Sequence, residues 1–146
     1  MPNTFQKSFE VRWDDVDANG HLRNTRCSEY ASTARHSYLT AAGWGVYALR
    51  KEGFAPVLLG EEAQYLREVF MGELVNVGCT IVGLSADASR WRMHHAVLRE
   101  DEEEAAVVRS LGAWIDLRSR KIAAPPSGLR TFLESECSDV CEVIGS

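Results

Sequence analysis

The feature that most constrains the fold of this chain is a helical pattern whose apolar face consists mainly of small residues. Between residues 24 and 42, small or apolar side chains recur at intervals of three and four, which places them on one face of a helix. They are Cys27, Tyr30, Ala31, Ala34, Tyr38 and Ala41. Alanines let a helix approach a sheet closely, and Gly43 supplies a stop signal. We therefore expect a sheet to pack directly against this helix.

Most of the other patterned segments predict strands. Residues 5–13 alternate, with Phe5, Phe9, Val11 and Trp13 on one side. Further strands are expected at residues 54–66, 74–84, 90–99 and 105–117, and a short helix at 127–134. The order strand, long helix, four strands predicts an α+β fold in which an antiparallel sheet wraps one helix.

The chain length and composition fit one domain over residues 1–134, followed by a flexible tail at 135–146. A net charge of -5 argues against a general nucleic-acid binder. We expect no membrane span and no signal peptide, and therefore a cytoplasmic protein. Because residues 105–117 are apolar on both faces, a second surface should be covered, which predicts a homodimer through sheet edges or faces.

The four cysteines are Cys27, Cys79, Cys137 and Cys141. Only the last two are close in sequence, and neither has a second Cys or His pair nearby. A structural zinc site is therefore not expected. We predict four free thiols in a reducing compartment.

The segment between the first strand and the helix, residues 13–24, concentrates three carboxylates, a histidine, two asparagines and a glycine. Asp15, Asp17 and Asn19 match the first positions of a calcium-binding EF-hand loop. However, Arg23 and Arg26 stand where the ion would need oxygen ligands. A calcium site is therefore not predicted, and no nucleophile elbow or phosphate-binding loop occurs elsewhere.

Asp17 lies just before the first turn of the predicted helix. The free N–H groups and positive dipole end of that turn could hold a developing oxyanion, while the carboxylate activates water or attacks directly. A helix or turn cap explains Asp17 equally well from its spacing alone.

The run from residue 15 to residue 24, Asp-Val-Asp-Ala-Asn-Gly-His-Leu-Arg-Asn, resembles the Asp-x-Asp-x-x-Gly-His-Val-Asn-Asn signature of hotdog-fold acyl-CoA thioesterases of the 4-hydroxybenzoyl-CoA thioesterase type. Weaker similarity continues through Tyr30, Ala34 and Arg35, then residues 65–67 and 114–117. The resemblance covers about residues 5–133. It implies the hotdog fold, a curved antiparallel sheet around a central helix with elements in the order β-α-β-β-β-β.

The resemblance also implies an activity, hydrolysis of an acyl-CoA or acyl-carrier-protein thioester, with active sites at the boundaries of a homodimer or homotetramer and no metal or cofactor. Asp17 matches the catalytic carboxylate, the backbone N–H of Asn24 matches the donor that polarises the thioester carbonyl, and His21 matches a residue that shapes the site. A non-catalytic acyl-thioester-binding protein, or a hydratase acting through Asp17 and His21, remains an alternative.

The chain departs from the family pattern at several positions, chiefly Arg23, Cys27, Ser28, Ser32 and Thr33. These changes remove bulk near the helix start and add a cation. Arg23, together with Arg90 and Arg92, is a candidate for substrate binding, because coenzyme A carries phosphates and arginine suits such groups. Exposed arginines at strand ends are also common without any such role.

Overall fold

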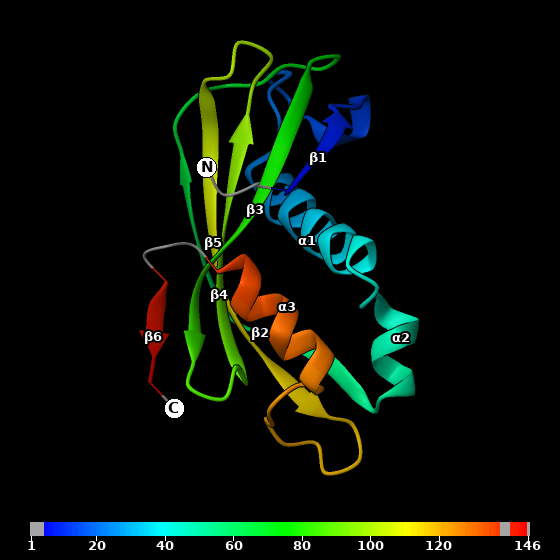
Figure 1. Ribbon diagram of the computed structural model, residues 1–146. Helices are drawn as coiled ribbons and strands as arrows, with labels where there is room; N and C mark the ends of the chain where they lie inside the picture. Colours follow the sequence, from blue (N-terminus) through cyan, green and yellow to red (C-terminus); the bar gives the residue numbers. More distant parts are fainter. Residues whose placement is uncertain (1–4, 138–140, 146) are drawn as a thin grey trace.

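The computed structural model describes residues 5–137 and 141–145. The strands are β1 (Phe5–Glu10), β2 (Phe54–Tyr65), β3 (Leu74–Ser85), β4 (Arg90–Leu98), β5 (Glu104–Asp116) and β6 (Glu142–Ile144). The helices are α1 (Asn24–Ala41), α2 (Val46–Lys51) and α3 (Ser127–Glu136), and a short 3-10 turn covers Trp13–Asp15. Figure 1 shows this arrangement.

The strands form a single open sheet in the order β1-β3-β4-β5-β2, with antiparallel neighbours throughout. β1 pairs with β3 from Phe5↔Cys79 to Glu10↔Leu74. Farther along the same edge of β3, β6 pairs in parallel at residues 83–85. β2 is an edge strand, a position that tolerates its Pro56.

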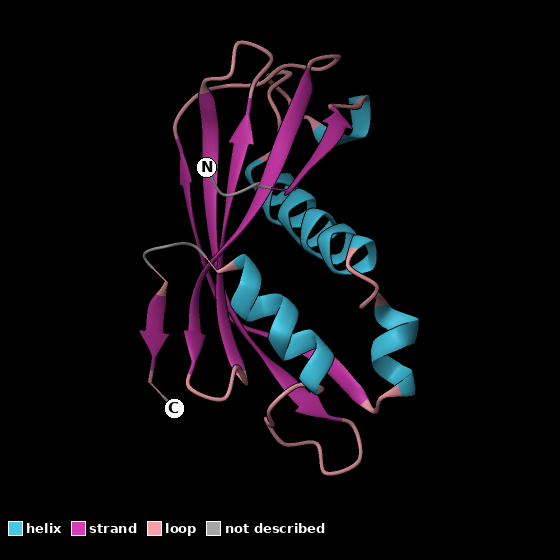
Figure 2. Cartoon of the chain, in the orientation of Figure 1, coloured by secondary structure: helices cyan, strands magenta, loops and turns pink. Residues whose placement is uncertain are grey.

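The long helix lies against one side of the curved sheet, the same side as α2 and α3 (Figure 2). Its small residues Ala31 and Ala34 are completely buried, so α1 approaches the sheet closely, as predicted. Alternate residues of β3 and β4 complete this core. They are Val75, Val77, Cys79 and Ile81 of β3, and Trp91, Met93, His95 and Val97 of β4, all buried. The strands predicted at residues 74–84 and 90–99 are thereby confirmed.

Two local expectations were wrong, and one short helix was missed. Trp13 does not continue the first strand: β1 ends at Glu10 and the 3-10 turn directs the indole outward, leaving it 79% exposed. Ala41 closes α1 but is exposed there. The six-residue α2 was not anticipated, because only Leu49 within it is buried and one residue gives no periodicity.

The cysteine prediction was wrong for one pair. Cys137 and Cys141 form a disulfide, and their Cα–Cα distance of 5.7 Å lies in the range that such a bond requires. Cys27 and Cys79 are free and buried, as expected.

The segment predicted as a flexible tail, residues 135–146, contains the end of α3 and the whole of β6. Residues 138–140 and 146 lie outside the described part. No helix within the described residues has the length and apolar character needed to cross a bilayer.

Candidate active site

The polar loop between β1 and α1 is held in shape by Asp15, which is 7% exposed. Its Oδ2 accepts hydrogen bonds from the backbone N–H of Arg12 and from the hydroxyl of Tyr30, both at 2.8 Å. Its Oδ1 lies 3.1 Å from Nε of Arg26. Burial, and then the bond to Asp15, raises the pKa of Tyr30, so the phenol remains a donor. Asp15 therefore anchors the loop to the first two turns of α1.

Asp17 sits at the start of a tight turn. Its backbone N–H donates to the carbonyl of His21 at 2.8 Å, and Gly20 (φ +79°) allows the chain to reverse between them. Its Oδ1 accepts from the backbone N–H of Asn19 at 2.9 Å and of His21 at 3.1 Å. Among the described residues, no donor bonds to Oδ2. One carboxylate oxygen therefore caps the turn, and the other is available for chemistry.

The N-terminus of α1 lies beside this turn. Arg23 occupies the N-cap position but makes no side-chain cap, and no acidic residue is present in the first turn. Within residues 5–137 and 141–145, the backbone N–H groups of Asn24 and Thr25 have no acceptor. The helix start therefore presents free donors and the positive end of its dipole.

A hollow of about 250 Å³ brings the three predicted catalytic residues together. It is lined by Asp17, His21, Leu22, Asn24, Tyr65, Leu66, Arg67 and Glu68. The imidazole Nε2 of His21 lies 3.5 Å from Oε2 of Glu68, and its ring packs edge-on against Phe70 with 4.9 Å between centroids. The hollow is thus lined by a carboxylate residue, by an imidazole that Glu68 and Phe70 contact, and by the first residue of α1.

Half of the residues that line the hollow come from the last residue of β2, Tyr65, and the segment that follows it. Backbone pairing fixes this segment beside the loop, since the N–H of Leu22 donates to the carbonyl of Val69 at 2.7 Å and His21 bridges to Phe70. Of its residues, Glu68 was missed by the sequence reasoning. No local pattern marks it, because its proximity to His21 depends on pairing between segments distant in sequence.

Arg23 does not line the hollow. Its guanidinium donates to the carbonyl of Asp14, and Arg26 donates to the same carbonyl at 3.2 Å. Both arginines therefore stabilise the loop from its Asp14 side.

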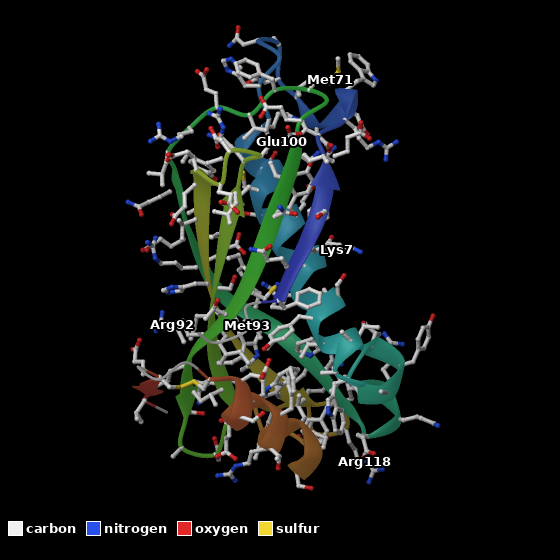
Figure 3. All side chains as sticks on the ribbon, turned by 45° about the horizontal axis from the view of Figure 1, so that its top comes forward. Lys7, Met71, Arg92, Met93, Glu100 and Arg118 are labelled. Carbon is white, nitrogen blue, oxygen red and sulfur yellow. A yellow bond between two sulfur atoms is a disulfide. The ribbon has the colours of Figure 1, made fainter. Side chains whose placement is uncertain are left out.

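Arg90 and Arg92 are not brought to the hollow either. In the sheet, Arg90 pairs with Ala113 of β5, which in turn pairs with Val57 of β2. Val57 lies eight residues before Tyr65, which is about 26 Å along the strand. Arg92 pairs with Glu142 of β6 at 3.5 Å. Figure 3 shows Arg92 well away from the end of the molecule marked by Met71 and Glu100.

No group of three His, Cys, Asp or Glu side chains suited to a metal ion is found in the part of the chain that the structure describes. Asp15 and Asp17, the residues that resemble calcium ligands in sequence, are engaged by backbone N–H groups, Tyr30 and Arg26 instead.

Comparison with known proteins gives relatives in sequence and structure. The L-carnitine dehydrogenase/betainyl-CoA thioesterase of Agrobacterium fabrum is 29% identical over 118 residues, which make up 80% of this chain and 24% of that protein. The chain thus spans about a quarter of the length of this relative.

Two solved structures illustrate the shared fold. A thioesterase from Thermus thermophilus, complexed with coenzyme A and zinc, is 28% identical with a TM-score of 0.73, over 89% of this chain and 92% of that one. The 1,4-dihydroxy-2-naphthoyl-CoA thioesterase from Synechocystis is 22% identical with a TM-score of 0.79, over 90% and 96%. These likenesses confirm the predicted hotdog fold.

The model of the thioesterase-like superfamily matches residues 11–133, from the residue after β1 into α3, and so includes the polar loop and the whole hollow. The chain therefore belongs to the thioesterase-like superfamily.

Proposed function

We propose that this protein hydrolyses acyl-CoA thioesters to a carboxylic acid and a free thiol. The observation that carries the proposal is the hollow lined by both Asp17, whose Oδ2 has no donor among the described residues, and Asn24, whose backbone N–H has no acceptor among them. Membership of the thioesterase-like superfamily and the 29% identical relative named as a betainyl-CoA thioesterase support it.

In the proposed reaction, the thioester carbonyl oxygen accepts a hydrogen bond from the Asn24 N–H. The negative charge that develops on this oxygen is stabilised by that donor and by the helix dipole. Asp17 either removes a proton from a water that attacks the carbonyl carbon, or attacks the carbon itself to form an anhydride that water then opens. The C–S bond breaks, and the thiolate leaves and takes up a proton. His21, held by Glu68 and Phe70, shapes the wall of the site.

We infer that the active protein is a homodimer or homotetramer, with each site at a boundary between copies; its cytoplasmic location stays a prediction. The edge strand β2 supports this inference. Its outer edge has no partner strand among the described residues, and its Leu58 and Leu59 are each 48% exposed. A second copy pairing there would bury these leucines and lie beside Tyr65 of the hollow. Binding of the coenzyme A phosphates by Arg23, Arg90 and Arg92 stays a prediction. These arginines lie outside the hollow, and the coenzyme A part of the substrate would extend beyond it.

The decisive variant is Asp17→Asn, because asparagine keeps an oxygen that accepts from Asn19 and His21 but cannot act as a base or nucleophile. We expect thiol release from acyl-CoA to fall by about 10²–10⁴-fold. Asp14→Asn is the matched control, since Asp14 belongs to the same loop but does not line the hollow. Full turnover in Asp17→Asn would refute the assignment.

The wild-type protein should be screened against acyl-CoAs and acyl-carrier-protein thioesters of varied chain length. Tight binding without any thiol release would favour the non-catalytic binding protein. Addition of water across a double bond, with the thioester intact, would favour the hydratase.

A further inference from the structure

The hollow contains a side-chain donor that the proposed reaction does not use. Tyr65 is the last residue of β2, and it lines the hollow together with Asp17 and Asn24. Its hydroxyl donates to the carbonyl oxygen of Asn24 at 3.4 Å. The phenol of the strand therefore reaches the first residue of α1, whose backbone N–H is the proposed oxyanion donor.

The main chain around Tyr65 is fixed by the neighbouring strand. Tyr65 pairs with Ala106 of β5. The N–H groups of the next two residues, 66 and 67, both donate to the carbonyl of Ala105, at 2.8 and 3.1 Å. A donor on a fixed main chain needs little rearrangement to meet a charge that develops beside it. The pairing thus keeps the phenol beside the helix start before a substrate arrives.

The present hydrogen bond of the Tyr65 hydroxyl is long and exchangeable. A bond between a hydroxyl and an oxygen is usually about 2.7–2.8 Å long, so the bond of 3.4 Å to the Asn24 carbonyl is weak. An oxygen that carries negative charge binds a hydroxyl at about 2.5–2.7 Å and roughly twice as strongly as a neutral one. Burial, and then the neighbouring Cys27 and Glu61, raises the pKa of Tyr65, so the hydroxyl keeps its proton. A developing oxyanion can therefore replace the Asn24 carbonyl as its acceptor.

The hydroxyl and the backbone N–H lie close enough to share one acceptor. Bond lengths place the nitrogen of a helical residue about 3.5 Å from its own carbonyl oxygen. The hydroxyl oxygen of Tyr65 is therefore no more than about 7 Å from the nitrogen of Asn24. Two donors that bind one oxygen at about 2.9 Å each must lie within about 5.8 Å of each other. A movement of the phenol by about 1 Å closes the largest gap that these limits allow.

Two other side-chain donors of the hollow face carboxylates. Nη2 of Arg67 lies 3.4 Å from Oε2 of Glu103. Nε2 of His21 lies 3.5 Å from Oε2 of Glu68. Within residues 5–137 and 141–145, the hydroxyl of Tyr65 makes no hydrogen bond to a carboxylate. Tyr65 therefore offers the hollow a neutral donor that is not committed to a negative charge of the protein.

We propose that Tyr65 is a second catalytic residue of the oxyanion site, whose hydroxyl donates a hydrogen bond to the thioester carbonyl oxygen alongside the backbone N–H of Asn24. The proposal rests on the proposed thioesterase function. The hydroxyl moves from the Asn24 carbonyl to the substrate oxygen as negative charge develops there, and its proton stays on the phenol throughout. Because this bond is strongest in the transition state, it accelerates the chemical step.

Tyr65→Phe tests the proposal, because it removes the hydroxyl and keeps the ring. We expect kcat for thiol release to fall about 10²-fold, with little change in KM. Tyr47→Phe is the matched control, since Tyr47 lies on α2, is 88% exposed and does not line the hollow. The control variant should keep the wild-type kcat. A wild-type kcat in Tyr65→Phe would overturn the proposal.

A background without the Asn24 N–H distinguishes a donor from a residue that only positions the helix start. If Tyr65 acted only by holding Asn24, adding Tyr65→Phe to Asn24→Pro would change nothing further, because the N–H is already absent. A hydroxyl that binds the oxyanion itself should still contribute at least tenfold to kcat in that background. An unchanged kcat on adding Tyr65→Phe to Asn24→Pro would show that Tyr65 is no donor.

Infrared spectroscopy separates this inference from the proposed function. An acyl-CoA with an isotope-labelled thioester carbonyl, bound to the Asp17→Asn variant, reports the hydrogen bonds to that oxygen without turnover. Binding should lower the carbonyl stretching frequency. Adding Tyr65→Phe should remove part of this shift, and adding Tyr47→Phe should not.

The outcomes of the two measurements are distinct. If the wild-type protein releases no thiol but the infrared shift depends on Tyr65, the hydrogen bond from Tyr65 stands and only the proposed reaction fails. If thiol is released and neither kcat nor the shift depends on Tyr65, only the role of Tyr65 fails. Absence of both thiol release and acyl-CoA binding would overturn both.

Discussion

Replacing Asn24 by proline isolates the backbone donor proposed to hold the oxyanion. Asn24 is the first residue of α1, a position where proline is well tolerated because the N–H there has no partner inside the helix. The preceding residue, Arg23, has φ -67° and ψ 140°, the extended conformation that a following proline requires. The substitution therefore removes one N–H while leaving the helix intact.

The size of the expected effect follows from the role of that single donor. Loss of one oxyanion-hole donor costs about 2.7–4 kcal/mol of transition-state stabilisation, or about 10²–10³-fold in kcat. Because the N–H of Asn24 has no acceptor among the described residues, its loss breaks no bond of the folded protein. The free energy of unfolding should change by less than about 0.5 kcal/mol, as for an ordinary surface substitution.

The assay is steady-state release of thiol from an acyl-CoA, with thermal unfolding measured in parallel. Asn24→Ala is the control, since alanine removes the side chain but keeps the N–H, and it should retain most of the wild-type kcat. A folded proline variant with the same kcat as the alanine variant would refute the reasoning and place the oxyanion donor elsewhere.

Two further predictions concern the core. Gly112→Ala should destabilise the protein by about 1–3 kcal/mol or more, because a Cβ at Gly112 would lie 2.0 Å from the Trp91 ring, whereas Gly60→Ala meets no atom within 4 Å and should have little effect in a urea titration. Burial, and then Arg35, lowers the pKa of His95 to about 4, so folding keeps it neutral while the unfolded chain takes up a proton near pH 6.5. Neutral His95 therefore contributes fully to the free energy of unfolding above pH 6.5, and about 3 kcal/mol of this free energy is lost as the pH falls toward 4. Urea unfolding across this range should show the loss, and the His95→Gln variant should lack this pH dependence.

The elements with strong periodicity were predictable from sequence, and those defined by single contacts were not. α1 and β4 each bury a regular set of side chains, so spacing alone located them within one or two residues. Trp13 continues the alternation of β1 in sequence, yet a turn held by Asp15 intervenes and rotates it outward. The Cys137–Cys141 bond depends on the distance between the two residues in space, which their spacing in the sequence does not specify.

The candidate site divides in the same way. Asp17, His21 and Asn24 lie within one short loop, so a sequence motif is enough to group them. Tyr65 and Glu68 reach the same hollow only through pairing between the loop and the segment after β2. Arg92 shows the opposite case. An arginine suits phosphate, but the sequence does not tell how far along the sheet it lies, and Arg92 pairs with Glu142 away from the hollow.

The two explanations of Asp17 that the sequence could not separate, a turn cap and a catalytic carboxylate, are compatible in the structure. Oδ1 accepts two backbone N–H groups and thereby fixes the carboxylate in one orientation, while Oδ2 has no donor in the described part of the chain. The helix start beside it shows the opposite arrangement: a Ser or Asp at position 23 would accept an N–H of the first turn, but Arg23 has no acceptor to offer. Leaving a helix uncapped costs about 0.5–2 kcal/mol. Under the proposed function, capping therefore immobilises the carboxylate that reacts, and the absence of a cap at Arg23 leaves the donors free for a substrate oxygen.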